Sequence, residues 1–328
     1  MIGHCVAVFG TGNAGMYHLR SLRAAGARIL AVPAHSNRRR TLEKAGFATV
    51  TDLDEAARHG AQACVVATDT HRHAKDATIA INCGLHVLVE KPAACDASAA
   101  YKLLATASRH NRQLYVGCVL RFSESLNLFR HLLRRIGDVH AVTIECRSYL
   151  PAWRSKRPYL KTYSARAAEG GVLRDLIHEI DYAGWIFGWP DRAAGRLENF
   201  GRLGIRSEEL ADLHWRSPQG SAVSIGLDYL TRPSRRRMTA YGHRGTLEWD
   251  TLAGTVSLSQ TGRQTLRRHS SQTMGSMFET QARAFLKALE GRHDEHLTTS
   301  AQGAHALAVC DAIRRSSRSH HEERVAIR

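Results

Sequence analysis

Short apolar runs alternate with helical patterns through roughly the first 120 residues. Helical periodicity passes through Leu19 and Leu22 and returns later in two longer segments. A continuous apolar run is typical of a strand buried on both faces, and strands that alternate with helices favour a parallel sheet. The pattern therefore predicts an α/β fold with a doubly wound parallel sheet. The expected strands are 6–9, 28–32, 63–68, 85–89 and 114–117, and the later helices are 71–82 and 98–110.

The pattern changes after Val119. Several strand-like runs now follow one another, separated by turn signals such as Pro218-Gln219-Gly220. Such a succession predicts an α+β domain with a large, mostly antiparallel open sheet and helices on one face. We expect domains at 1–120 and 121–328. The expected strands are 139–149, 210–216, 221–229, 236–242, 245–250 and 255–259, and the helices are 126–136, 172–187, 273–290 and 299–315.

A glycine-rich segment joins the first strand to the first helix: Gly10, Thr11, Gly12, Asn13, Ala14 and Gly15. Glycines permit a tight turn and a close approach of backbone amides to a pyrophosphate, and the helix start adds a partial positive charge. In this strand–loop–helix–strand setting the segment predicts a dinucleotide site. Residues 1–120 are therefore the expected Rossmann domain.

The residues after the second strand distinguish NADP(H) from NAD(H). An NAD site usually has Asp or Glu there, to bind the ribose 2′-hydroxyl. This chain has no carboxylate until Glu43, and instead has Ser36 and the arginines that begin with Arg38. A hydroxyl and guanidinium groups suit a 2′-phosphate, so we expect NADP(H) to be preferred, with NAD(H) as the alternative. The arginines could also be only a solvated first turn.

The net charge and the cysteines of the chain limit which binding partners and which cellular compartment are expected. The 328 residues carry 46 Lys and Arg against 30 Asp and Glu, a net charge of +16, which raises nucleic acid, an anionic membrane or a phosphorylated substrate as possibilities. The basic residues are scattered and not interleaved with aromatics, so we expect solvated basic faces and neither nucleic-acid nor membrane binding. Seven scattered cysteines without paired metal spacing suit a reduced cytoplasmic protein without a metal. A first strand near Met1 and no long apolar stretch indicate neither a signal peptide nor a membrane span.

Two motifs in the first domain resemble those of the Gfo/Idh/MocA oxidoreductases, which include glucose–fructose oxidoreductase and inositol dehydrogenase. The first is Gly10-x-Gly12-x-x-Gly15-x-x-His18. The second begins at Ala67-Thr68, continues through His73 and Gly84-Leu85-His86-Val87, and ends at Glu90-Lys91-Pro92. The resemblance implies that cofactor-binding residues include Thr68, His73, Glu90, Lys91 and Pro92. It also implies a homodimer or homotetramer paired through the second domain.

The family's third motif is a helix that carries Asp and His after a glycine pair, which here corresponds to Gly170-Gly171 and the helix that follows. Many members place the Asp four residues before the His, but here Arg174 holds that position and Asp175 stands three before His178. Either spacing would put the two side chains on neighbouring parts of one helix face. We expect Lys91 to bind the reacting oxygen, His178 to carry the proton, and Asp175 to orient it or hold a substrate hydroxyl.

An aromatic and basic segment precedes this motif. Aromatic faces stack on sugar rings and guanidinium groups bind phosphate. The resemblance implies a carbohydrate substrate, because the family acts mostly on sugars, cyclitols, sugar phosphates and nucleotide sugars. The side chains of the segment favour a sugar phosphate or a nucleotide sugar, although the segment could also be a packing loop or an oligomer arm. The expected substrate-binding residues are Lys91, Arg121, Trp153, Arg154, Tyr159, Tyr163, Asp175 and His178.

Two other functions stay open from the sequence. Within enzymes, the alternative is an NAD-dependent dehydrogenase of inositol-like cyclitols or free sugars. Outside enzymes, the alternative is a non-catalytic NADP-binding sensor on the same fold, which Arg174 weakly favours. Substrate-dependent reduction of NADP⁺ distinguishes an enzyme from a sensor.

Overall fold

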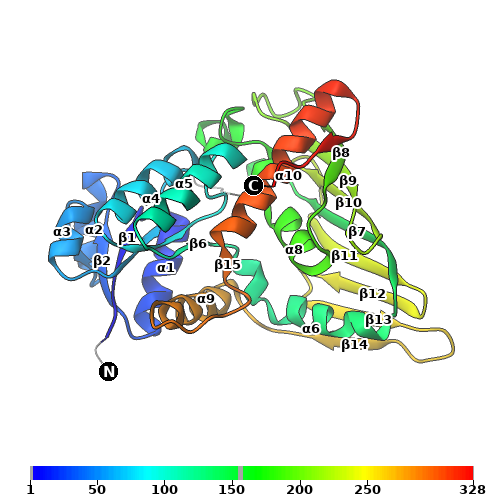
Figure 1. Cartoon of the computed structure of the whole chain (residues 1–328), viewed down its shortest axis with the longest axis horizontal. Helices are drawn as coiled ribbons and strands as arrows, with labels where there is room; N and C mark the ends of the chain where they lie inside the picture. The colour runs from blue at the N-terminus through cyan, green and yellow to red at the C-terminus, as the bar shows by residue number, and fades with distance from the viewer. Residues whose placement is uncertain (1–2, 154–157, 328) are drawn as a thin grey trace. The chain divides into compact units, whose positions relative to one another are not determined.

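The computed structural model describes residues 3–153 and 158–327 (Figure 1). The chain forms two compact units. The first comprises Met1–Phe122 and Thr273–Ala304, and the second comprises Ser123–Gln272 and His305–Arg328. The sequence placed 273–304 in the second domain, but helix α9 (Met274–Leu289) packs against α1 (Asn13–Ala24) in the first unit. The assignment of cofactor and substrate roles to the two domains stays a prediction.

The first unit contains the predicted parallel sheet. Its strand order is β3-β2-β1-β4-β5-β6, and β15 adds an antiparallel edge beside β6. This order reverses between β1 and β4, as in dinucleotide-binding folds, and such a reversal opens a crevice at the carboxyl ends of the strands. The strands are β1 (Cys5–Phe9), β2 (Arg28–Val32), β3 (Ala48–Thr49), β4 (Ala63–Val66), β5 (His86–Val89), β6 (Leu114–Val116) and β15 (Thr298–Thr299).

Helices cover both faces of this sheet. One apolar cluster contains Leu19 and Leu22 of α1 together with Phe285 of α9. The other contains Ile81 and Leu103, from the helices on the opposite face. Burial on both faces explains why the strands read as continuous apolar runs. The remaining helices are α2 (Arg39–Lys44), α3 (Leu53–Arg58), α4 (His73–Asn82) and α5 (Ala97–Arg109), with short 3₁₀ turns at Ser36–Arg38, Thr70–Arg72 and Val119–Phe122.

The second unit contains a sheet in the order β14-β13-β12-β11-β7-β10-β9-β8-β16. Within this sheet, only β7 and β10 pair in parallel among the described strands, so the prediction of a mostly antiparallel sheet is confirmed. The strands are β7 (Val139–Arg147), β8 (Arg192–Glu198), β9 (Leu210–Arg216), β10 (Ala222–Asp228), β11 (Arg235–Gly242), β12 (Gly245–Asp250), β13 (Thr255–Ser259), β14 (Leu266–His269) and β16 (Glu323–Arg324).

Helices pack on this sheet and leave alternating positions of its strands exposed. Helix α6 (Glu124–Leu132) packs on β12 and β13, and α8 (His178–Phe187) packs on β7 and β10 (Figure 1). Helix α10 (Ser300–Ser319) begins in the first unit, and its later turns bind β8 through Ser316 and Ser317. The other elements are α7 (Val172–Asp175) and 3₁₀ turns at Leu133–Arg135, Leu150–Ala152, Tyr159–Lys161 and Tyr163–Ala165.

Candidate active site

The glycine loop lies between β1 and α1, at the carboxyl edge of the parallel sheet. Gly10 has φ +91°, and a Cβ there would lie 2.5 Å from the carbonyl carbon and oxygen of Ala67. A Cβ at Gly15 would overlap the carbonyl oxygen of Gly10. These two glycines are therefore required by the turn itself and by the close packing of α1 against it.

Gly12 differs from the other two glycines of the loop. Its φ is −71°, which any residue can adopt, and an added Cβ would meet no protein atom within 4 Å. Gly12 and Asn13 are exposed at the start of α1, and Ala14 is half-buried beside them. The first turn of α1 carries no acidic residue, and Gly12 has no side chain to cap it. The open space and the helix start fit a dinucleotide pyrophosphate.

Arg38, in the 3₁₀ turn that follows β2, contacts the same loop. Its Nη2 donates a hydrogen bond to the carbonyl oxygen of Thr11 at 2.7 Å. Glu43, the first carboxylate after β2, accepts hydrogen bonds from Arg39 at 2.9 Å and from Thr49 at 2.7 Å. The guanidinium of Arg38 is thus the charged group held at the glycine loop. Ser36 opens the same 3₁₀ turn, and its side chain lies outside the described part of the structure.

The loops after β4 and β5 are held together by His73 of α4. Its Nδ1 lies 2.7 Å from the carbonyl oxygen of Pro92, and its Nε2 lies 3.0 Å from that of Thr68. Both partners are acceptors, so both hydrogen bonds form only when each ring nitrogen carries a hydrogen. The buried Thr68 hydroxyl has no hydrogen-bond partner among the described residues, so it can donate to or accept from a bound ligand.

Glu90 and Lys91 follow β5 directly, also at the carboxyl edge. His18 of α1 donates from Nε2 to Glu90 Oε1 at 2.7 Å, and the backbone N–H of Lys91 donates to Glu90 Oε2 at 3.2 Å. Burial raises the pKa of Glu90, but the His18 hydrogen bond and the charges of His18, Lys91 and His73 outweigh it and hold that pKa below its usual range. A charged carboxylate therefore lies beside the half-buried Lys91.

The predicted helix 172–187 is broken in the structure. Helix α7 ends at Asp175 and α8 begins at His178, because Leu176 leaves helical geometry with φ −98° and ψ 32°. A tight turn spans the break, in which Ile177 N donates to the carbonyl oxygen of Arg174. The expectation that Asp175 and His178 share one helix face is therefore wrong. The carboxylate closes one helix and the imidazole opens the next.

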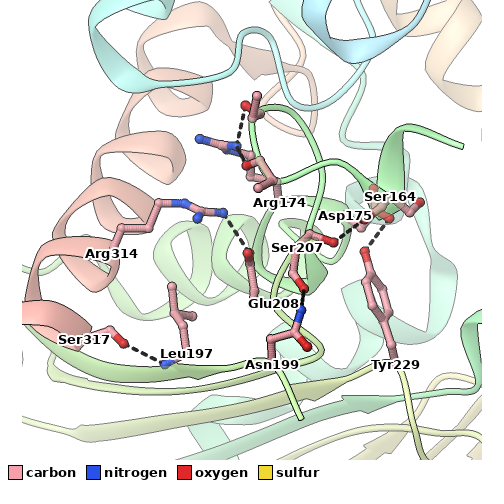
Figure 2. A network of polar contacts seen from close by, with 12 residues as sticks. Ser164, Arg174, Asp175, Leu197, Asn199, Ser207, Glu208, Tyr229, Arg314 and Ser317 are labelled. Atoms are coloured by element: carbon pink, nitrogen blue, oxygen red, sulfur yellow. Dashed lines mark hydrogen bonds and ion pairs between the residues drawn. The ribbon is translucent and has the colours of Figure 1, made fainter. Parts of the chain in front are cut away.

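Asp175 is buried and held by Tyr229, at the end of β10. The Tyr229 hydroxyl donates to Asp175 Oδ2 at 2.5 Å (Figure 2). Burial and the Asp175 charge raise the pKa of Tyr229 well above its ordinary value, so the phenol stays a donor at neutral pH. Trp153 stands edge-on to the Tyr229 ring, with centroids 5.4 Å apart. Two predicted site residues, Trp153 and Asp175, are thus brought together by a tyrosine that sequence reasoning missed.

Arg174 points away from this group. Its Nη1 donates to the carbonyl oxygens of Ala168 at 2.8 Å and Ala167 at 3.4 Å (Figure 2). It therefore supports the backbone that leads into Gly170-Gly171 and leaves Asp175 as the carboxylate of this motif. Nearby, Arg314 of α10 donates to Glu208 at 2.7 Å, and the Glu208 carboxylate occupies the space that a Cβ at Gly171 would need.

The first turn of α8 is anchored to the sheet. Glu179, which has no exposed surface, accepts a hydrogen bond from Arg236 Nε at 2.7 Å. Burial disfavours the charged form of Arg236, but the Glu179 carboxylate outweighs that effect and raises the Arg236 pKa. This ion pair fixes Glu179, the residue that follows His178. His178 itself is half-buried.

The other predicted substrate residues are dispersed. Tyr159 is half-buried and donates to the carbonyl oxygen of Leu203 at 3.1 Å, and Tyr163 is half-buried in a 3₁₀ turn. Arg154 lies outside the described residues. Arg121 has 0 % exposure and donates to Gln302 at 2.9 Å. A side chain without exposed surface cannot touch a substrate, so we correct the prediction for Arg121 and assign it a structural role.

Lys91 and the cofactor residues belong to the first unit, whereas Trp153, Asp175 and His178 belong to the second. Within residues 3–153 and 158–327, no group of three or more His, Cys, Asp and Glu side chains could hold a metal ion. No helix of the described chain is both long and apolar enough to cross a membrane.

Two models of one oxidoreductase family match the chain. Residues 5–118 match "Oxidoreductase family, NAD-binding Rossmann fold", and residues 130–248 match "GFO/IDH/MocA C-terminal domain". The first match lies in the first unit and the second match lies in the second unit, and together they span most of the chain.

Curated relatives and solved structures agree with this assignment. The chain is 28% identical over 184 residues to 2,7-anhydro-N-acetylneuraminate hydratase of Mediterraneibacter gnavus, covering 56% of this chain and 49% of that protein. It is 30% identical over 194 residues to inositol 2-dehydrogenase 1 of Saccharopolyspora erythraea, covering 55% and 53%. These matches span about half the length of each relative. Levoglucosan dehydrogenase in complex with NADH and levoglucosan shares the fold, with a TM-score of 0.88 at 17% identity, over 98% of this chain and 99% of that one.

The glycine loop, the Glu90-Lys91-Pro92 turn and the two matched domains lead to one conclusion. The chain belongs to the GFO/IDH/MocA family of oxidoreductases with an NAD-binding Rossmann fold.

Proposed function

We propose that this protein is an NADP(H)-dependent dehydrogenase or reductase acting on a secondary alcohol or ketone of a carbohydrate. The observation that carries the proposal is the carboxyl edge of the parallel sheet, which bears both the open Gly12 and Lys91. A dinucleotide at the first turn of α1 would be held by the loop amides, with the Thr68 hydroxyl and the His73-supported loops beside it.

Oxidation of a secondary alcohol requires a hydride acceptor and an acceptor for the hydroxyl proton. A nicotinamide supplies the hydride chemistry when it is bound. For the proton, we assign Lys91 to hydrogen-bond the reacting oxygen and His178 to accept the proton. In reduction of a ketone, His178 returns the proton to the oxygen while Lys91 keeps its hydrogen bond to that oxygen. Asp175, fixed as an acceptor by Tyr229, would orient a substrate hydroxyl or the imidazole.

The preference for NADP(H) rests on Arg38. Its guanidinium is held at the carbonyl oxygen of Thr11. Glu43 accepts hydrogen bonds from Arg39 and Thr49. A positive charge would therefore face the ribose of a bound dinucleotide. Calorimetry of NADPH and NADH binding tests this preference. We expect Arg38→Ala to weaken NADPH binding at least about tenfold and NADH binding by less than about threefold, whereas Arg58→Ala, at an exposed arginine outside the Arg38–Arg40 run, serves as the control. Tighter binding of NADH by the unaltered protein would defeat the preference and favour the NAD-dependent alternative.

The substrate class rests on the segment before α7 and on the names of the relatives. The hydratase and the inositol dehydrogenase are named for a sugar acid and a cyclitol, and the fold neighbour was solved with an anhydrosugar. Trp153 and Tyr159 present aromatic rings, and basic side chains flank them in the sequence. These features support a carbohydrate, and the basic side chains favour a phosphorylated or nucleotide-linked sugar.

A reduction screen with NADP⁺ and NAD⁺ over sugar phosphates, nucleotide sugars and cyclitols tests the activity. The reduced nicotinamide is followed by absorbance, with Lys91→Ala as the inactive control that still binds cofactor. Turnover confined to free cyclitols with NAD⁺ would favour the inositol-like alternative. Cofactor binding without turnover of any carbohydrate would favour the sensor.

The proposal includes a homodimer or homotetramer that pairs through the sheet of the second unit. A hollow of about 540 Å³ lies on the second sheet, lined by side chains of β7, β9, β10, β11 and β12 that include Arg147, Asp212 and Arg237. Sedimentation measures the subunit number directly.

A further inference from the structure

Glu90 is held from two directions inside the first unit. Oε1 accepts from His18 Nε2 at 2.7 Å and Oε2 accepts from the backbone N–H of Lys91 at 3.2 Å. Because a charged carboxylate only accepts, the hydrogen of the His18 contact is on Nε2. Gly117 leaves the room for this arrangement, since a Cβ there would lie 3.1 Å from Glu90 Oε1.

The His18 ring is itself fixed. Only 1% of the residue is exposed, and its ring stands edge-on to Phe278 of α9, with centroids 4.9 Å apart at 87°. Tyr17 stacks on the same Phe278 ring with centroids 4.9 Å apart. His18 also belongs to the helix whose first turn forms the glycine loop. One helix therefore carries both the proposed pyrophosphate site and the donor that holds Glu90.

We propose that His18 is a positioning residue for Lys91: it holds the Glu90 carboxylate, which in turn holds the backbone of Lys91. This inference rests on the proposed function, because it takes Lys91 as a catalytic residue. A rigid link of this kind keeps the lysine amine at a constant place relative to a cofactor seated at α1, and misplacement of a reacting group by about 1 Å can cost about a hundredfold in rate.

Two substitutions of His18 separate the effect of its hydrogen bond from the effect of the volume of its ring. His18→Gln keeps an N–H donor at a comparable reach, whereas His18→Leu leaves the Glu90 carboxylate buried without it. His4 supplies a control for the loss of a histidine–carboxylate pair elsewhere in the unit, because it pairs with Glu290 at 3.1 Å and is partly exposed. His4→Leu removes a histidine–carboxylate pair without touching the lysine turn.

Steady-state kinetics with the substrate found in the screen tests the proposal first. We expect kcat of His18→Leu to fall at least about tenfold while KM for the cofactor changes less than about threefold, with His18→Gln and His4→Leu near the unaltered protein. A purely structural role would lower the thermal stability of His18→Leu and would change its kcat and its KM for the cofactor together. If His18→Leu does not fold, His18→Asn, whose donor is too short to reach Glu90, takes its place.

A second readout needs no turnover. The rate at which an amine reagent labels Lys91 in the cofactor-free protein is measured by mass spectrometry, with Lys75 and Lys102 as internal references. Release of the lysine turn should make Lys91 label at least about threefold faster in His18→Leu than in His4→Leu. Equal labelling, or an unchanged kcat, overturns the positioning role. If no carbohydrate is turned over, the proposed function fails, and the labelling alone decides whether His18 holds the turn.

Discussion

Alanine at each glycine of the loop separates glycines that the fold requires from the one that a ligand requires. Gly10 and Gly15 have no room for a Cβ, because it would meet the backbone of Ala67 or of Gly10 itself. Gly12 has room, and its φ of −71° suits alanine. We therefore expect alanine at Gly10 or Gly15 to lower the stability of the fold, and alanine at Gly12 to weaken cofactor binding instead.

The expected magnitudes follow from these contacts. For Gly12→Ala, the loss of a favourable residue at the helix N-cap costs about 1 kcal/mol or less. The reduced freedom of the unfolded chain returns about 0.4–1 kcal/mol, so the free energy of unfolding should change little. Gly15→Ala and Gly10→Ala force backbone atoms apart, and each should cost at least about 1–3 kcal/mol.

For cofactor affinity, Gly12→Ala is the substitution with the direct effect. A methyl group at position 12 occupies the space at the start of α1, and it should remove one charge-assisted hydrogen bond between the loop and a pyrophosphate, at about 1.5–3 kcal/mol. The dissociation constant for the cofactor should therefore rise by about tenfold to a few hundredfold.

Denaturant unfolding and titration calorimetry measure the two quantities on the same preparations. Gly12→Ala should unfold with the unaltered protein and bind the cofactor weakly. If Gly12→Ala binds the cofactor with undiminished affinity, the open space at Gly12 is not the pyrophosphate site. If it instead unfolds as readily as Gly15→Ala, the structural reasoning about Gly12 fails.

Three further outcomes are expected. Tyr229→Phe removes the donor to Asp175, so kcat should fall about tenfold with stability lowered by about 1–2 kcal/mol, and an unchanged kcat would contradict the assigned role. Burial and the hydrogen bond to Asp54 raise the pKa of the Cys83 thiol to about 11, so alkylation of Cys83 near pH 8 should be slow and several times faster in Asp54→Asn, as mass spectrometry can measure. Because the folded-state pKa of Glu90 lies below its unfolded value, its contribution is present above the unfolded pKa and is lost as pH falls through the folded one. Glu90→Gln should therefore be about 2 kcal/mol less stable at neutral pH, with a flatter loss of stability in acid unfolding curves.

Much of the fold was predictable because burial leaves a periodic record in the sequence. The strands Arg28–Val32, Leu210–Arg216, Gly245–Asp250 and Thr255–Ser259 have the predicted bounds. Strand β8 was missed because Arg192–Glu198 contains no β-branched or aromatic residue. It forms as a strand through its pairing with β9 and the cover of α10, which are contacts between distant segments.

The candidate site was predictable where one motif is continuous along the chain. The glycine loop and Glu90-Lys91-Pro92 are such motifs, and the structure puts both at one sheet edge. Tyr229 was missed because it lies 54 residues from its partner Asp175, although its place after an apolar strand was a usable signal. The helix break at Leu176 was missed because Leu176 and Ile177 are apolar and fit a helical period.

The return of residues 273–304 to the first unit has a consequence for how the protein is made. The chain leaves this unit at Phe122, builds most of the second sheet, and only then supplies α9, whose Phe285 packs with Leu19 and Leu22. During synthesis the nucleotide-binding unit therefore begins first but is completed only after the second sheet has emerged from the ribosome. A fragment ending at Phe122 would leave that apolar face uncovered, and its exposed leucines would be a target for chaperones and for aggregation.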